Sequence, residues 1–187
     1  MYLYIILMSD DLSASFDKYR GYLLDVIPEL KYMIGFDQKH PHHHLDLWTH
    51  TMYALSLSEK NFEIRLSLLL HDIGKPFSYQ EGEVRHFKGH AKVSSEISRE
   101  ILDRLGYEKI FIDKICKYVE LHDTPIKEKD IESDPEFYSK LYKIQCCDSL
   151  AHNPDKLGKR KEYDSDQNNF RLPWNYRGPH WRHTQSA

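Results

Sequence analysis

The sequence contains no apolar run long enough to cross a membrane. The apolar run near the N-terminus, residues 2–8, is far shorter than the roughly 20 residues that a spanning helix needs. This run also lacks the basic start and the small-residue cleavage site of a secretory signal. We therefore expect a cytoplasmic protein with no membrane partner.

Cysteine is scarce as well. Cys116, Cys146 and Cys147 form neither a CxxC motif nor an even-numbered framework, so we expect reduced thiols and exclude a zinc ribbon. The net charge is −3, whereas a protein that binds nucleic acid over its whole surface carries an excess of basic residues. The charge therefore argues against that class of protein. A chain of 187 residues with 40% hydrophobic content fits one globular domain with a core.

The C-terminal segment departs from this balance. Residues 156–187 carry seven basic and three acidic side chains, with Trp174, Tyr176 and Trp181 among them. We expect a domain over residues 1–155 and a mostly irregular basic tail over 156–187, with a polar linker at 158–169. Such a tail either contacts an RNA 3′ end or packs back on the domain, and its composition suits both.

Apolar residues recur at helical spacing along most of the chain, and no strand pattern of any length occurs. The spacing predicts helices over residues 45–58, 62–73, 90–105, 110–122 and 135–151. Gly74 and Pro76 are expected to end the second of these helices, and residues 77–87 to form a loop or small hairpin. The sequence therefore predicts an all-α fold, a single helical bundle.

Histidine is the anomaly of the composition, with twelve residues, five of which lie between positions 40 and 50. The most informative of them is His71, which is followed directly by Asp72 at the end of an apolar run. A neutral imidazole beside a carboxylate suits divalent Mn, Fe, Ni, Zn or Mg centres, which perform phosphate chemistry. This pair is hard to explain by packing.

Further candidate ligands lie on separate predicted helices. His50, the His71-Asp72 pair and Asp148 come from three helices, which is how helical bundles usually build metal sites. Asp72 can bridge two ions because a carboxylate has two oxygens. Each of His90 and His122, at helix ends, is by itself more often a surface or capping histidine, but together with the pair and Asp148 they suit a second ion. We expect one or two divalent ions.

Other polar residues near these positions receive lesser roles. The histidine tract before the helix over residues 45–58 is expected to be an exposed lead-in that supplies one or two side chains supporting the ligands (His40, His42, His43 and His44). His86 is expected on a loop near the cleft, and Arg65 as a structural partner on a buried helix. Asp46 and Asp123 are expected at the surface or beside ligands.

The order H…HD…H…H…D resembles the HD-domain superfamily of metal-dependent phosphohydrolases. The closer similarity is to the HD domain of bacterial tRNA nucleotidyltransferases, the CCA-adding enzymes, and covers about residues 23–154. The matching segments are Pro28-Glu29, Gln38, the stretch 41–46, the run HDIGKP at 71–76, Gly89-His90 and the stretch 148–154. The sequence contains no strand-rich nucleotidyltransferase head, so it resembles the hydrolytic module alone.

The resemblance implies hydrolysis of nucleotide or RNA-end phosphate esters by a metal-activated water, as in 2′,3′-cyclic phosphodiesterases, nucleotidases and phosphatases. One or two ions of Mn, Ni, Co, Fe, Mg or Zn would be the cofactor. Asp72, Lys75 and His122 are the expected catalytic residues: Lys75 would hold a phosphate oxygen, and His122 or His90 would protonate the leaving oxygen if metal-free. Lys75, Arg85 and His86 are the expected substrate-binding residues.

Three alternatives stay open. Lys75 also fits a lysine placed at a helix C-terminus by the helix dipole. The same ligand set in a di-iron form would suit an oxygenase. A structural metal with a partner-binding tail would make the chain a non-catalytic binding module.

Overall fold

The computed structural model describes residues 2–41 and 43–152, and these form helices joined by loops. No strand occurs within these ranges, and the one strand-like pairing in them is an isolated bridge between Gln80 and His86. The predicted all-α fold is confirmed. The elements are α1 (Tyr2–Leu7), α2 (Leu12–Val26), the 3-10 helix η1 (Pro28–Tyr32), α3 (Leu47–Leu57), α4 (Phe62–Leu70), α5 (Lys75–Ser78), α6 (His90–Arg104), α7 (Lys109–Leu121), α8 (Glu128–Ser133) and α9 (Pro135–Leu150).

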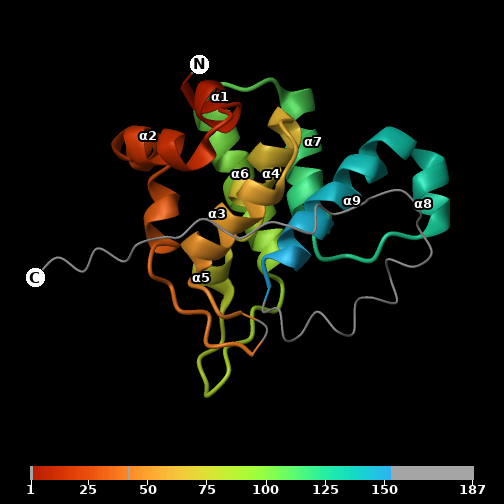
Figure 1. The fold of residues 1–187 in the computed structure, drawn as a ribbon. Coiled ribbons are helices and arrows are strands. Elements are labelled where there is room, and N and C mark those ends of the chain that lie inside the picture. The colour runs from red at the N-terminus through yellow and green to blue at the C-terminus, as the bar shows by residue number, and fades with distance from the viewer. Residues whose placement is uncertain (1, 42, 153–187) are drawn as a thin grey trace, which may run out of the picture.

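Helix α4 lies at the centre of the bundle (Figure 1), where it contacts α1, α3, α6, α7 and α9. Every residue from Ile64 to Leu70 is buried. The apolar residues of α4 occur on all its sides instead of forming one stripe, which is typical of a helix enclosed by other helices. The buried Arg65 guanidinium donates hydrogen bonds to the carbonyls of Leu7 and Ser9 at 2.7 and 3.0 Å. Its expected structural role is confirmed, since it fixes the end of α1 against α4.

Side-chain caps mark the starts of α3, α4 and α9. The Asp46 carboxylate accepts hydrogen bonds from the backbone N–H groups of Trp48 and Thr49 at the start of α3. Asn61 and Asp134 cap α4 and α9 in the same way. Asp46 is therefore a capping residue, and it sets the register that turns His50, one helical turn later, into the bundle.

The predicted helix over 62–73 ends earlier than expected, at the end of α4, and the chain then turns through His71 and Asp72. Pro76 does not end a helix but begins α5, where a missing N–H costs nothing. Gly74 is needed for space: a Cβ there would lie 2.5 Å from the Ser94 backbone nitrogen and 2.8 Å from the His90 carbonyl. The loop predicted over residues 77–87 begins later than expected, because Phe77 and Ser78 belong to α5. None of the predicted ranges covers α1, α2, α5 or α8.

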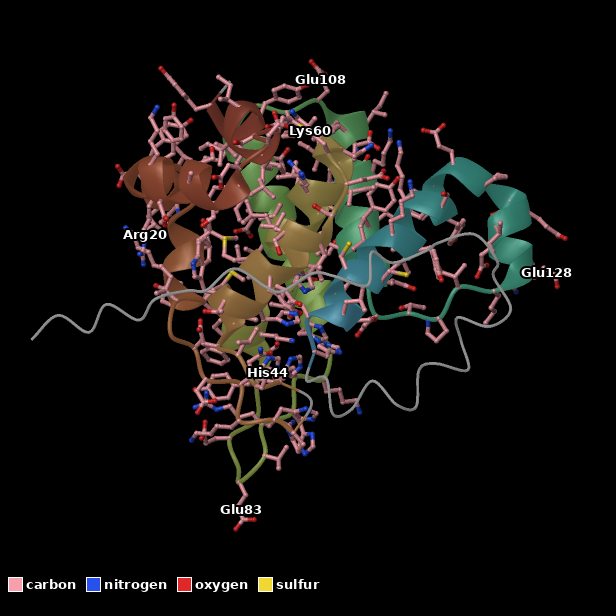
Figure 2. The ribbon with its side chains drawn as sticks, viewed as in Figure 1. Arg20, His44, Lys60, Glu83, Glu108 and Glu128 are labelled. Carbon is pink, nitrogen blue, oxygen red and sulfur yellow. The ribbon has the colours of Figure 1, made fainter. Side chains whose placement is uncertain are left out.

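Two loops project from one end of the bundle, the first with residues 37–41 and 43–46 and the second with residues 79–89, and Glu83 lies at the tip of the second (Figure 2). Nitrogen-bearing side chains gather beside His44 at this end. Among the described helices, none is long and apolar enough to span a membrane. The predicted linker and tail, residues 156–187, lie outside the described residues. The three cysteines are free of disulfides.

Candidate metal centre

Four predicted ligands meet at the end of the bundle where the two loops lie. We call His50, His71, Asp72 and Asp148 the inner group; each has a ligand atom within 4.8 Å of the others, and all are buried. His50 comes from α3, the adjacent pair from the turn after α4, and Asp148 from α9. Neighbouring side chains on a regular helix point about 100° apart, and in the turn after α4 both members of the pair reach the same site.

A second group shares Asp72 and adds His90, from the start of α6, and His122, directly after α7. Asp72 Oδ1 lies 3.2 Å from His90 Nε2 and 3.6 Å from His122 Nε2. Its other oxygen, Oδ2, lies 3.2 Å from His71 Nε2 and 3.8 Å from His50 Nε2. One carboxylate therefore faces both histidine pairs, the arrangement of a bridging ligand between two ions.

Backbone carbonyls orient the histidines of both groups. The Nδ1 atoms of His71, His90 and His122 lie 2.7–2.8 Å from the carbonyl oxygens three residues earlier in the chain. His50 Nδ1 lies 3.2 Å from the Ala151 carbonyl. A carbonyl oxygen only accepts a hydrogen bond, so each Nδ1 is the donor, and Nε2 is the ring nitrogen that faces the site.

Several polar atoms in the centre of the site are buried without a hydrogen bond of normal geometry to any described residue. They are His71 Nε2 and both carboxylate oxygens of Asp72, although Lys75 Nζ forms an ion pair with Oδ2 at 2.7 Å. Such atoms are costly unless another partner satisfies them. A set of imidazole nitrogens and carboxylate oxygens with these orphaned atoms fits a divalent ion.

The charges of the site are strongly coupled. Burial lowers the pKa of His71, but the carboxylates of Asp72 and Asp148 outweigh it and raise that pKa to about 10. Burial raises the pKa of Asp72, but His71 and Lys75 hold it well below its ordinary value. A divalent ion would take over the charge that these protons and the lysine supply to the carboxylates.

Lys75 lies inside the site, with 4% of its surface exposed. Its ammonium donates a hydrogen bond to Gln38 Oε1 at 2.9 Å in addition to its ion pair with Asp72. Gln38 is itself buried, and its amide donates to the Leu45 carbonyl at 3.3 Å. Lys75 is thus aimed at the ligands by its neighbours and is not an exposed lysine at a helix end.

Arg85 and His86, two of the expected substrate-binding residues, are placed differently. The Arg85 guanidinium bonds to Glu81 and to the Asp37 carbonyl and lies over the rings of Phe36 and Tyr79. It joins the two loops, and these contacts give no support for phosphate binding. His86 is exposed and pairs with Gln80 through its backbone.

Two histidines of the site were not expected as ligands. His43, one of the predicted lead-in residues, and His152, just after α9, form with His50 a third cluster whose ligand atoms lie within 4.8 Å of one another. Burial lowers the pKa of His43 to about 2 and that of His152 to about 4. The spacing Asp148 to His152, one helical turn, was the available signal. His44 and Asp123 are exposed, and His42 lies outside the described residues.

Comparison with known proteins agrees with the motif order. The family model of the HD domain matches residues 43–165. The chain is 36% identical over 110 residues to the CC-adding tRNA nucleotidyltransferase of Thermus thermophilus, and this match covers 54% of the chain and 25% of that protein. It is 30% identical over 120 residues to the A-adding tRNA nucleotidyltransferase of Deinococcus radiodurans, covering 59% of the chain and 27% of that protein. The matched region is thus about a quarter of each relative.

Proposed function

Because the chain belongs to the HD domain family, we propose that it is a metal-dependent phosphohydrolase acting on phosphate esters of nucleotides or RNA ends. The observation that carries this proposal is Asp72, a buried carboxylate with one oxygen facing His90 and His122 and the other facing His50 and His71. A bridging carboxylate between two histidine pairs is an arrangement suited to two-metal hydrolysis of phosphate esters.

The inner group would hold the first ion, and Asp72, His90 and His122 the second. When bound, a divalent ion supplies a Lewis acid for a phosphate oxygen and lowers the pKa of a water molecule. The protein supplies the fixed orientation, because the Nδ1 hydrogen bonds hold each imidazole in place.

Lys75 and His122 would serve the substrate directly. The Lys75 ammonium lies 2.7 Å from Asp72 Oδ2. A phosphate oxygen bound beside this carboxylate would therefore lie close to the positive charge of Lys75. His122 Nε2 faces the site at 3.2 Å from His90 Nε2. With a single ion bound, this nitrogen would be free of metal, and when it carries a second ring proton it would donate that proton to the leaving oxygen.

The relatives support a nucleotide or an RNA end as the substrate. Both are named tRNA nucleotidyltransferases, and the chain matches about a quarter of each. Within this class we propose 2′,3′-cyclic phosphodiesterase activity, with nucleotidase or phosphatase activity on the product.

The test is hydrolysis of 2′,3′-cyclic AMP by chelator-treated protein after addition of Mn, Ni, Co or Mg. We expect turnover that requires the ion, disappears in Asp72→Asn and is unchanged in His44→Ala, a matched change at an exposed histidine of the same end. Metal-binding protein that hydrolyses neither this substrate nor nucleoside monophosphates would contradict the proposal. Oxygen consumption by iron-loaded protein would instead identify an oxygenase, and a metal needed for folding alone would identify a binding module.

A further inference from the structure

The third histidine cluster adjoins the inner group on the side away from His90 and His122. We call His43, His50 and His152 the outer group. The His152 ring stacks on the His50 ring with centroids 5.4 Å apart and planes 18° apart. The His43 ring stands nearly perpendicular to both, at 5.3 Å from His50 and 4.7 Å from His152. Two of the imidazoles are thus stacked, and the third stands edge-on to both.

The outer and inner groups share a ligand atom. His50 Nδ1 donates its proton to the Ala151 carbonyl, so Nε2 alone can bind an ion. Asp148 Oδ1 joins the groups as well, since it lies 3.0 Å from His50 Nε2 and 3.5 Å from His152 Nε2. Because one nitrogen lone pair binds one ion, full coordination by the outer group and by the inner group are alternatives.

The two groups differ in access to solvent. The side chains of His50 and His71 are 1% and 0% exposed, whereas that of His152 is 23% exposed. An ion bound by the inner group must reach a position that is closed to water on most sides. Imidazoles at the partly open side supply ligands that can replace the hydration shell of the ion as it enters.

We propose that the outer group is the entry position for the divalent ion, which His43 and His152 capture and His50 then passes to the inner group. The ligand class is a divalent transition metal that accepts imidazole, such as cobalt, nickel or zinc. This inference rests on the metal centre of the proposed function and is independent of the substrate.

An entry position has a kinetic signature that a permanent ligand lacks. It lowers the barrier between free and bound ion without contacting the ion in its final place. The association and dissociation rates therefore change by the same factor when the entry position is removed, and Kd, their ratio, stays constant. Loss of a permanent ligand instead raises the dissociation rate and weakens Kd.

The experiment follows Co²⁺ uptake by metal-free, full-length protein through its visible absorption in a stopped-flow instrument, and Co²⁺ release to a chelator. The variants are His152→Ala and His152→Phe, of which the second keeps the stacked ring without a nitrogen, together with His43→Ala. We expect uptake and release both to slow by the same factor, about tenfold, which corresponds to about 1.4 kcal/mol in the barrier. The number of ions bound and Kd should not change.

His44→Ala is the matched control, because it removes an exposed histidine next to His43 that belongs to no cluster. It should load at the wild-type rate, and thermal unfolding checks that each variant is folded. Unchanged rates in His152→Phe and His43→Ala would overturn the proposal, and so would a weaker Kd or the loss of one equivalent. Since Co²⁺ binding is measured without any phosphate ester, failure of the proposed hydrolysis would leave this result intact.

Discussion

Replacing Asp72 by Asn should empty both candidate ion positions at once. The inner group would keep His50, His71 and Asp148, whereas the second group would keep two histidines and no carboxylate. His90→Ala removes a ligand from the second group alone. Isothermal titration with Mn²⁺ or Co²⁺ should therefore detect two ions in the wild type, one in His90→Ala and none at micromolar concentrations in Asp72→Asn.

The same change also has a calculable effect on the metal-free protein. Lys75 Nζ lies 2.7 Å from Asp72 Oδ2, and the two side chains are 6% and 1% exposed. Removing one partner of a buried ion pair costs on the order of 3–5 kcal/mol. We expect about 3 kcal/mol in urea unfolding of Asp72→Asn, the low end, because Lys75 keeps its hydrogen bond to Gln38.

The double variant Asp72→Asn with Lys75→Met separates the ion pair from other effects. It removes both buried charges, so it should recover much of the lost free energy of unfolding. If Asp72→Asn bound two ions, or if the double variant were no more stable than the single one, the assignment of Asp72 as the shared carboxylate paired with Lys75 would be wrong.

Three further predictions concern the frame around the site. Gly74→Ala would place a Cβ 2.5 Å from the Ser94 nitrogen, so it should cost on the order of 1–3 kcal/mol in thermal unfolding and also weaken binding of the second ion. Burial raises the pKa of Glu63, but the ammonium groups of Lys140 and Lys114 hold that pKa below its ordinary value. The ionised Glu63 side chain therefore stabilises the fold above its unfolded-state pKa, and this stabilisation is lost as the pH falls through the lower folded-state pKa. Glu63→Gln should remove this part of the pH dependence of the free energy of unfolding. A pH profile identical to that of the wild type would contradict the prediction. Arg65→Met removes the guanidinium that donates hydrogen bonds to four backbone carbonyls and should cost on the order of 1–3 kcal/mol in urea unfolding, with earlier proteolysis at α1. Equal protease resistance would count against it.

The helical fold could be predicted because periodicity is local. Predicted and observed bounds agree within two residues for α3, α6, α7 and α9. The end of α4 at Leu70 could not be predicted, because the local stop signals, Gly74 and Pro76, lie further along the chain. The turn after α4 depends on the close approach of α6 to Gly74, which is a contact between distant segments.

The metal centre divides in the same way. The sequence by itself determined the ligand types, since imidazole and carboxylate chemistry does not depend on the fold, and it selected His50, His71, Asp72, His90, His122 and Asp148. The tertiary structure decided which oxygen of Asp72 faces which histidine pair, and it showed that the Arg85 guanidinium joins two loops. It also decided that His43 and His152, 109 positions apart, pack against each other beside His50. Such proximity arises from the packing of α3 against α9, which no spacing along the chain encodes.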